Sequence, residues 1–256
     1  MPTDAQAAIS VLRNLHENLV GITGKLSADD VRRPSYADEW TIAQVLSHLG
    51  SGGVINKLNL DLALAGRPAP DQEEYLAIWD TWNAKSPDEQ AADMAEADRA
   101  LVETYEGMDE SQLTTVRVPF AGMQLDVVGA ARLRIAEHAI HTWDVAVMLD
   151  ESATVDAAAI EQIVDLTPQV AGWAGKPSGE NVAVQLTMDN PVRSFTLTST
   201  DAVILEPGAN PALPVVDLPA EAFVRLVYGR LDPAHTPEIA RGEEFLPSLR
   251  AIFPGF

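Results

Sequence analysis

Four segments in the first 150 residues of this 256-residue chain carry apolar residues at helical spacing. These segments are residues 4–26, 41–64, 86–107 and 125–148. A helix with one apolar stripe has to bury that stripe, and four such helices bury their stripes most simply against one another. The pattern therefore predicts a four-helix bundle with loops between its helices.

Local signals support the ends of these helices. Thr41 followed by Gln44 resembles a capping box, in which each side chain satisfies a backbone N–H of the first turn. The serine before Pro87 also predicts the beginning of a helix, because proline is tolerated in the first helical turn. Gly24 is the expected stop of the first helix.

The pattern changes after Asp150. One more helical segment is expected at residues 157–173, followed by alternating apolar and polar residues that predict short strands. The expected strands lie near residues 182–188, 195–197, 202–205 and 215–216. A last helix is expected to open at Pro219 and stop at Gly229. The sequence thus predicts a two-domain α+β protein, with a helical bundle at 1–150 and a smaller α+β domain at 151–256.

Charge and composition restrict the partners. Asp and Glu number 38 against 17 Lys and Arg, which gives a formal charge of −21, and this charge repels both nucleic acid and anionic lipid surfaces. The chain has no cysteine, so disulfides and cysteine nucleophiles are excluded and any thiol chemistry needs an outside thiol. Neither a secretory leader nor an apolar membrane span is evident, and a cytoplasmic location is expected.

The fourth helix contains a group of polar residues on one face. Glu137 and His141 are one turn apart and lie about 40° from each other around the helix, so they can share a ligand. Asp144 lies on the same face, whereas His138 is turned about 100° away from Glu137. His48, early in the second helix, is the best third candidate.

Two histidines and one carboxylate suit zinc, with iron(II) or nickel as alternatives. In that arrangement Asp144 can accept the free N–H of a ligating imidazole and fix its tautomer. The alternative is that Glu137 and His141 form a solvated polar pair and that His48 is a half-buried packing residue. His16 and His235 are expected at the surface.

The two tryptophans near these residues can be interpreted as core anchors or as platforms for a substrate. Trp40 and Trp143 are expected to be core anchors rather than platforms for a substrate.

Two segments, PSYADEWTIAQVLSHLG (34–50) and RIAEHAIHTWDVAV (134–147), resemble the mycothiol-dependent maleylpyruvate isomerase family. The first domain of that family is a DinB-like metal-binding four-helix bundle. The resemblance implies that His48, Glu137 and His141 are ligands of a divalent metal, usually zinc. It also extends to the second domain, which in the family is similar to sterol carrier proteins and is matched here by LVYGR at 226–230.

The resemblance further implies an external cosubstrate, mycothiol, whose thiolate would add to a cis double bond, allow rotation and then be eliminated from the trans isomer. Arg230 would hold a carboxylate of the small-molecule substrate, since guanidinium offers a bidentate fork, but it is equally interpretable as a surface arginine near a helix end.

Other functions stay open at this point. S-transfer of the thiol onto an electrophile suits the same residues as isomerisation does. A non-catalytic metal-binding protein or a carrier of an apolar ligand is the alternative outside enzymes.

Overall fold

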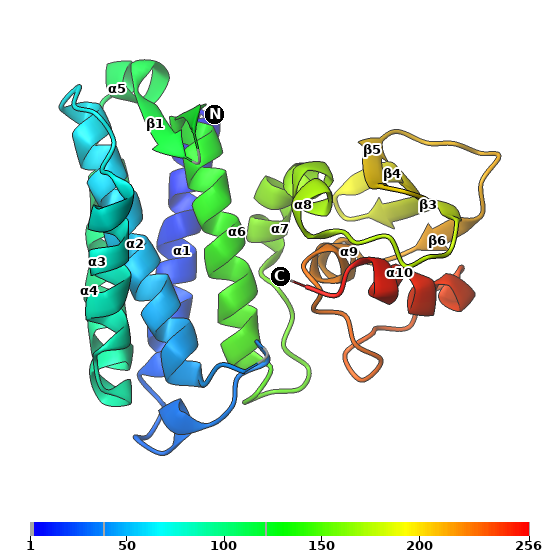
Figure 1. Ribbon diagram of the computed structural model, residues 1–256, viewed down its shortest axis with the longest axis horizontal. Coiled ribbons are helices and arrows are strands. Elements are labelled where there is room, and N and C mark those ends of the chain that lie inside the picture. Colours follow the sequence, from blue (N-terminus) through cyan, green and yellow to red (C-terminus); the bar gives the residue numbers. More distant parts are fainter. Residues whose placement is uncertain (1–2, 38, 121, 256) are drawn as a thin grey trace. The chain divides into compact units, whose positions relative to one another are not determined.

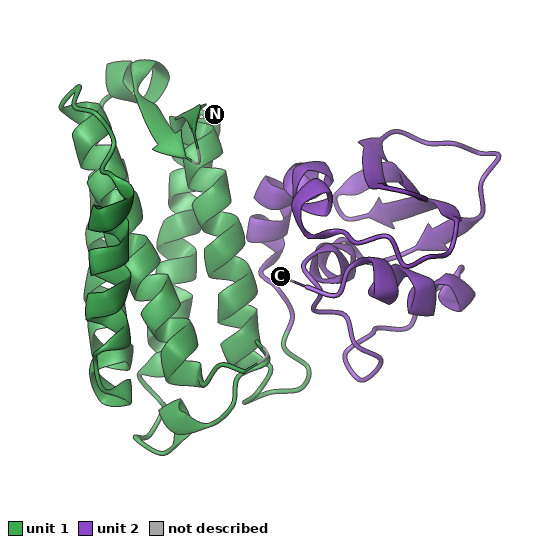
Figure 2. Cartoon of the chain, in the orientation of Figure 1, with its two compact units in different colours: residues 1–153 green, residues 154–256 purple. Residues whose placement is uncertain are grey.

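The computed structural model describes residues 3–37, 39–120 and 122–255. The chain divides into two compact units, Met1–Ala153 and Thr154–Phe256 (Figure 2). The first unit contains long helices and a small hairpin, and the second combines short helices with a four-stranded sheet. The two-domain α+β fold class expected from the sequence is therefore confirmed.

Four long helices build the first unit as a bundle (Figure 1). They are α1 (Asp4–Thr23), α2 (Ile42–Leu64), α4 (Pro87–Glu106) and α6 (Val127–Ala146). Helix α1 packs against α4 and α6, and α2 packs against the same two helices. The stripes predicted from the sequence meet in the core between them, where Trp143, Tyr105 and Leu46 are among the largest fully buried side chains.

Capping boxes fix where these helices begin. Thr3, Thr41 and Ser86 each accept a hydrogen bond from the third helical N–H, and the side chain at that position bonds back to the cap. A cap of this kind contributes about 1 kcal/mol. The start of α2 matters most for the site described below, because this start sets which α2 side chains face α6.

Glycines in α2 allow its neighbours to come close. A Cβ atom added to Gly53 would lie 3.3 Å from the carbonyl carbon of Ala97 on α4. One added to Gly50 would overlap the ring of Trp82. Gly53 therefore allows the close approach of α2 and α4, and Gly50 leaves room for the ring of Trp82.

The segment 69–85, where a loop is expected, instead contains helix α3 (Gln72–Asn83). Its apolar side chains point in different directions, since Trp82 is buried in the bundle core whereas Leu76 and Trp79 are exposed. Ile78 and Trp82, one helical turn apart, both pack in that core, and Asp71 with Glu74 forms a capping box, so the sequence does contain signals for this helix.

A short helix and a β-hairpin lead into α6. Helix α5 (Glu110–Thr115) precedes β1 (Arg117–Phe120), which pairs antiparallel with β2 (Met123–Asp126). The fourth helix begins at Val127, two residues later than expected, because Leu125 lies in β2. The Asp126 side chain accepts the Gly129 N–H and caps α6 at this point.

The second unit is built on one sheet with the strand order β5-β4-β3-β6. Its strands are β3 (Val182–Asp189), β4 (Val192–Ser199), β5 (Val203–Pro207) and β6 (Val215–Asp217). The β3–β4 and β4–β5 pairs are antiparallel, and β6 pairs parallel with β3. All four strands coincide with those predicted from the alternation of apolar and polar residues.

Short helices complete the second unit. They are α7 (Ala157–Ile163), α8 (Thr167–Ala174), α9 (Ala220–Val227) and α10 (Leu246–Ile252). The single helix expected at 157–173 is wrong, since a 3₁₀ turn at Val164–Leu166 separates α7 from α8. Pro168 in the first turn of α8 cannot continue a preceding helix.

Helix α9 packs on the sheet through Phe223, whose ring stacks on Phe195 with centroids 5.2 Å apart. It stops before Gly229 as predicted. Gly229 has a φ of +72°, and a Cβ added there would overlap the backbone of Gly255. Pro219 occupies the cap position just before α9.

No helix in the described part of the chain is both long and apolar enough to cross a membrane.

Candidate metal centre

His48 lies in the second turn of α2, at the edge of its buried face. Val45 and Leu49 on either side of it are fully buried. The His48 side chain keeps 35% of its surface exposed. Packing therefore fixes the helix around His48 while leaving its imidazole available.

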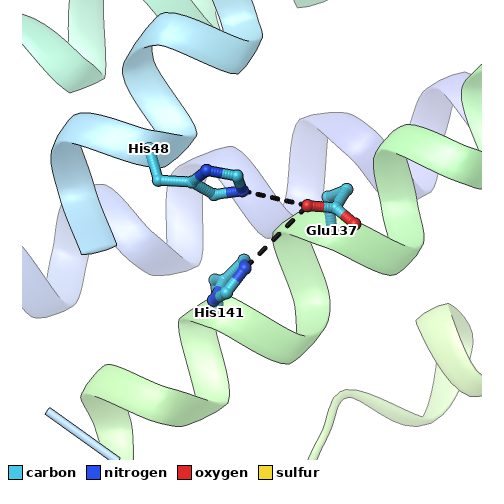
Figure 3. Close-up of side chains that lie close together, drawn as sticks. All are labelled: His48, Glu137 and His141. Carbon is cyan, nitrogen blue, oxygen red and sulfur yellow. Dashed lines mark hydrogen bonds and ion pairs between the residues drawn. The ribbon is translucent and has the colours of Figure 1, made fainter. Parts of the chain in front are cut away.

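Glu137 and His141 approach His48 from α6 (Figure 3). The Nε2 atom of His48 lies 3.0 Å from Oε2 of Glu137, and the Nε2 atom of His141 lies 3.9 Å from the same oxygen. The potential ligand atoms of the three residues all lie within 4.8 Å of one another. The packing of α2 against α6 thus brings together the three residues singled out in the sequence.

This donor set fits a divalent cation. Tetrahedral zinc sites have Zn–N and Zn–O distances of ~2.0–2.2 Å, so their ligand atoms lie about 3.4 Å apart. The separations of 3.0 and 3.9 Å bracket that value. Three protein ligands leave one tetrahedral position open, and Glu137 keeps 51% of its side chain exposed, so small molecules can reach the site.

Asp144 orients His141. Its side chain is fully buried, and its Oδ2 atom accepts a hydrogen bond of 2.9 Å from Nδ1 of His141. With the proton on Nδ1, the neutral ring presents the lone pair of Nε2 toward Glu137. This contact is the one expected for Asp144 from the sequence.

The environment of Glu137 favours its ionised form. Partial removal from water raises the pKa of this carboxyl, but the hydrogen bond with His48 and the proximity of His141 and Arg134 outweigh that effect and lower the pKa to about 2. Glu137 is therefore a carboxylate at neutral pH, which is the form that coordinates metals.

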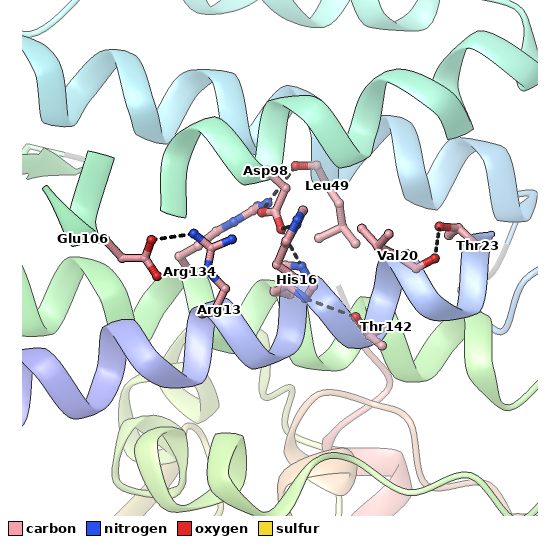
Figure 4. Close-up of polar contacts among 10 residues, drawn as sticks. Arg13, His16, Val20, Thr23, Leu49, Asp98, Glu106, Arg134 and Thr142 are labelled. Atoms are coloured by element: carbon pink, nitrogen blue, oxygen red, sulfur yellow. Dashed lines mark hydrogen bonds and ion pairs between the residues drawn. The ribbon is translucent and has the colours of Figure 1, made fainter. Parts of the chain in front are cut away.

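A second carboxylate with two histidines lies deeper in the bundle (Figure 4). The Oδ2 atom of Asp98 on α4 lies 3.0 Å from Nδ1 of His16 on α1 and 3.0 Å from Nε2 of His138 on α6. The Nη2 atom of Arg134 donates to Oδ1 of Asp98 and to the carbonyl of Leu49 on α2, each at 2.8 Å. The Asp98 cluster (His16, Asp98, Arg134 and His138) therefore connects all four long helices.

The surroundings of the Asp98 cluster suit an ion pair. Asp98 is 1% exposed and Arg134 is 3% exposed. Burial alone would favour protonated Asp98, but the charges of His138 and Arg134 hold the pKa of this carboxyl well below its usual range. The guanidinium supplies the counter-charge that a metal would otherwise provide, and it repels a second cation. The cluster is thus a structural connection between helices.

The sequence analysis missed this cluster, and the expectation that His16 is exposed was wrong. His16 follows Leu12 by four residues and precedes Leu19 by three, which places it on the buried stripe of α1. Asp98 follows the buried Met94 in the same way. A titratable residue at a helix position whose neighbours one turn away are apolar was the sequence signal for this cluster.

The two tryptophans near the site differ. Trp143 is 1% exposed, which confirms it as a core anchor. Trp40 is 36% exposed, so the same expectation for Trp40 was wrong. Its ring instead lies against those of His48 and His141.

The remaining candidates lie in the second unit. Arg230 is half-buried, and its Nη1 atom donates to the carbonyl of Tyr228 at 2.8 Å. His235 is also half-buried, with its Nδ1 atom 3.0 Å from the carboxylate of Asp232, so the expectation of an exposed His235 was wrong.

Comparison with known proteins gives a family for the helical unit. A family model for the N-terminal domain of mycothiol maleylpyruvate isomerase matches residues 12–146, more than half of the chain. The matched range contains His48, Glu137 and His141. No curated protein sequence matches the chain.

Two solved structures share the fold over nearly the whole length. A crystal structure of the mycothiol-dependent maleylpyruvate isomerase has a TM-score of 0.66 and 16% sequence identity, covering 94% of this chain and 100% of that one. A histidine-to-alanine mutant of an enzyme with the same name has a TM-score of 0.66 and 15% identity, covering 90% and 92% of the two chains. Together with the family model, these similarities show that the chain belongs to the mycothiol-dependent maleylpyruvate isomerase family.

Proposed function

We propose that this protein is a metal-dependent enzyme that uses mycothiol. It either isomerises a small electrophilic substrate bearing a carboxylate or attaches the sulfur of mycothiol to that substrate. The observation that carries the proposal is the convergence of His48, Glu137 and His141 within 4.8 Å, inside the range matched by the family model.

The three residues hold one divalent cation, for which zinc is the best fit to two imidazoles and a carboxylate. Such a cation lowers the pKa of a coordinated thiol and so supplies a thiolate at neutral pH. Glu137 offsets part of the cation's charge, and Asp144 keeps His141 in the tautomer that can bind.

The sulfur comes from outside the protein, because the chain contains no cysteine. Addition of the thiolate sulfur to one carbon of a cis double bond forms a carbon–sulfur bond and leaves a carbanion next to the carbonyl group, so the former double bond becomes a single bond that can rotate. Elimination then breaks the carbon–sulfur bond, restores the double bond in the trans form and releases the thiolate. In S-transfer the sulfur stays on the substrate, because the carbanion takes up a proton or because the thiolate displaces a leaving group.

Arg230 holds the carboxylate of the substrate in this proposal. Its guanidinium offers two parallel N–H donors, and a cation is needed to attract an anion to a chain of formal charge −21. Replacement by alanine should then lower kcat/KM by roughly ten- to a hundredfold, the effect of one hydrogen bond to a charged group, while metal content stays unchanged.

The test combines metal analysis with turnover. Purified protein should contain near-stoichiometric metal, and maleylpyruvate should be converted only when both metal and mycothiol are present. His48→Ala should lose the metal and the activity, whereas His235→Ala, which removes a histidine from the other unit, should keep the metal. Conversion of substrate with water alone would overturn the thiol dependence and indicate metal-assisted hydrolysis. A product that retains the sulfur would identify S-transfer instead of isomerisation.

A further inference from the structure

Trp40 exposes a large aromatic ring beside the candidate metal ligands. Its ring centroid lies 5.2 Å from that of His48 and 6.0 Å from that of His141, and its plane is inclined by only 24° to the His141 ring. The two imidazoles are themselves 4.7 Å apart. A tryptophan used for core packing is normally buried, but Trp40 keeps 36% of its surface exposed.

The backbone around Trp40 is held in place. The carbonyl of Trp40 accepts hydrogen bonds from the N–H and the hydroxyl of Ser35, at 2.8 and 2.9 Å. Glu39, just before it, has a φ of +66° and is the one non-glycine residue with a positive φ in the described part of the chain. Tyr36 donates its N–H to the carbonyl of Asp144, which connects this loop to α6. Unfavourable backbone conformations persist where the surroundings enforce them, and they cluster at functional sites.

We infer that Trp40 is a positioning residue for the thiol, and that it favours sulfur over water at the open position of the metal centre. The inference rests on the proposed function. A ligand bound between His48 and His141 would lie near the Trp40 ring, which packs against both imidazoles. Sulfur is polarisable and makes favourable contacts with aromatic rings. A water molecule beside an indole face instead gives up hydrogen bonds, which is unfavourable.

A cobalt-substituted protein provides a readout that does not depend on turnover, because thiolate coordination to Co²⁺ produces a charge-transfer absorption. The Co²⁺ protein is titrated with mycothiol and, separately, with 2-mercaptoethanol. Trp40→Ala should bind both thiols about two- to tenfold more weakly, as expected for the loss of a sulfur–aromatic contact. Its Co²⁺ content should stay at the wild-type level.

Two further variants isolate the role of the ring. Trp40→Phe retains an aromatic face and should recover most of the thiol affinity, whereas Trp40→Leu retains apolar bulk alone and should not. Trp79→Ala is the matched control, because Trp79 is a similarly exposed tryptophan on α3, 43% exposed. The Phe and Leu pair also keeps the test decisive if the alanine variant fails to fold.

The outcomes separate this inference from the proposed function. A wild-type Co²⁺ protein that shows no thiolate absorption with either thiol would contradict the proposed function itself. Wild-type binding with equal thiol affinity in the Phe and Leu variants would overturn the role of Trp40 and leave the function standing. Loss of Co²⁺ from the Leu variant would also overturn it, since Trp40 would then support the metal ligands rather than the thiol.

Discussion

Helix α6 contributes to two groups that each contain one carboxylate and two histidines. One is the candidate metal centre around Glu137, and the other is the Asp98 cluster. The two groups differ in their surroundings. Around Glu137 the carboxylate is half exposed, and its close neighbours are imidazoles. The carboxylate of Asp98 is buried, and the guanidinium of Arg134 donates a hydrogen bond to one of its oxygens. We propose from this comparison that an open side and the absence of a competing cation, rather than the residue types alone, decide whether such a group binds a ligand or joins helices.

The largest effect expected from this difference is on stability. Asp98→Ala should lower the free energy of unfolding by about 3–5 kcal/mol, because Arg134 would stay buried without its counter-charge. Urea unfolding measures this loss. Asp93→Ala, on the exposed side of the same helix, removes a surface ion pair with Lys85 and should cost less than about 1 kcal/mol.

If the alanine variant does not fold, Asp98→Asn tests the same point with nearly unchanged volume. Equal losses for the Asp98 and Asp93 variants would contradict a structural role for the Asp98 cluster.

The next effect concerns metal affinity. Glu137→Ala should weaken zinc binding by at least about 100-fold, more than the 10–100-fold typical of residues that only orient a ligand. The unfolding free energy of the metal-free protein should change by less than about 1 kcal/mol, since Glu137 is half exposed. Chelator competition gives the affinity, and Glu73→Ala on α3 serves as an exposed control. A variant that keeps zinc but unfolds easily would reverse the roles assigned to the two carboxylates.

A smaller effect is expected at the residue behind His141. Asp144→Asn removes the negative charge that keeps the proton on Nδ1 of His141, and it should weaken zinc binding by about 10–100-fold. Zinc stoichiometry at saturation should stay at one ion per chain, because the three ligands are intact. Unchanged affinity, measured by the same chelator competition, would mean that packing alone orients His141.

The smallest effect is a pH dependence of stability. The pKa of Asp98 is lower in the folded than in the unfolded protein, so ionised Asp98 contributes stability that is present above the unfolded value of about 3.9 and is lost as the pH falls toward the folded pKa. The stability advantage of the wild type over Asp98→Asn should therefore shrink below pH 4, by at most about 1.4 kcal/mol per pH unit. Urea unfolding at pH 5, 4 and 3 measures it, and an advantage that grows on acidification would be the wrong sign.

The helical geometry of the sequence was sufficient to bring Glu137, His141 and Asp144 to one face, because residues within one helix have fixed angular positions. His48 could be named as the best third candidate from its place early in the second helix, and the resemblance then implied that it is a ligand. Its position opposite α6 could not be read from the sequence pattern, since the packing of α2 against α6 is a long-range property. The four strands were predictable because one face of each is buried, as for Val184 and Leu186.

Other features depended on partners that are distant in the sequence. The spacing of His16 from Leu12 and Leu19 could have indicated its burial, but its partner Asp98 is 82 positions away and could not be read from its neighbours. Trp40 was expected in the core because of its size, but the short loop that carries it is fixed by Ser35 and by the backbone of Asp144 in a position that leaves the ring exposed. Helix α3 is different, because its capping box and the core-facing pair Ile78 and Trp82 were readable in the sequence.

The position of Asp98 at the meeting point of four helices also has a consequence for the order of folding. No pair of docked helices satisfies this carboxylate, because its partners come from α1 and α6, and the guanidinium that binds it also needs the carbonyl of Leu49 on α2. A partly assembled bundle that lacks α4 or α6 would therefore bury one member of the Asp98–Arg134 ion pair without its partner, at a cost of several kcal/mol. Intermediates without either helix are disfavoured for this reason, and the most protected backbone amides of α4 and α6 should exchange with solvent through a single, shared opening.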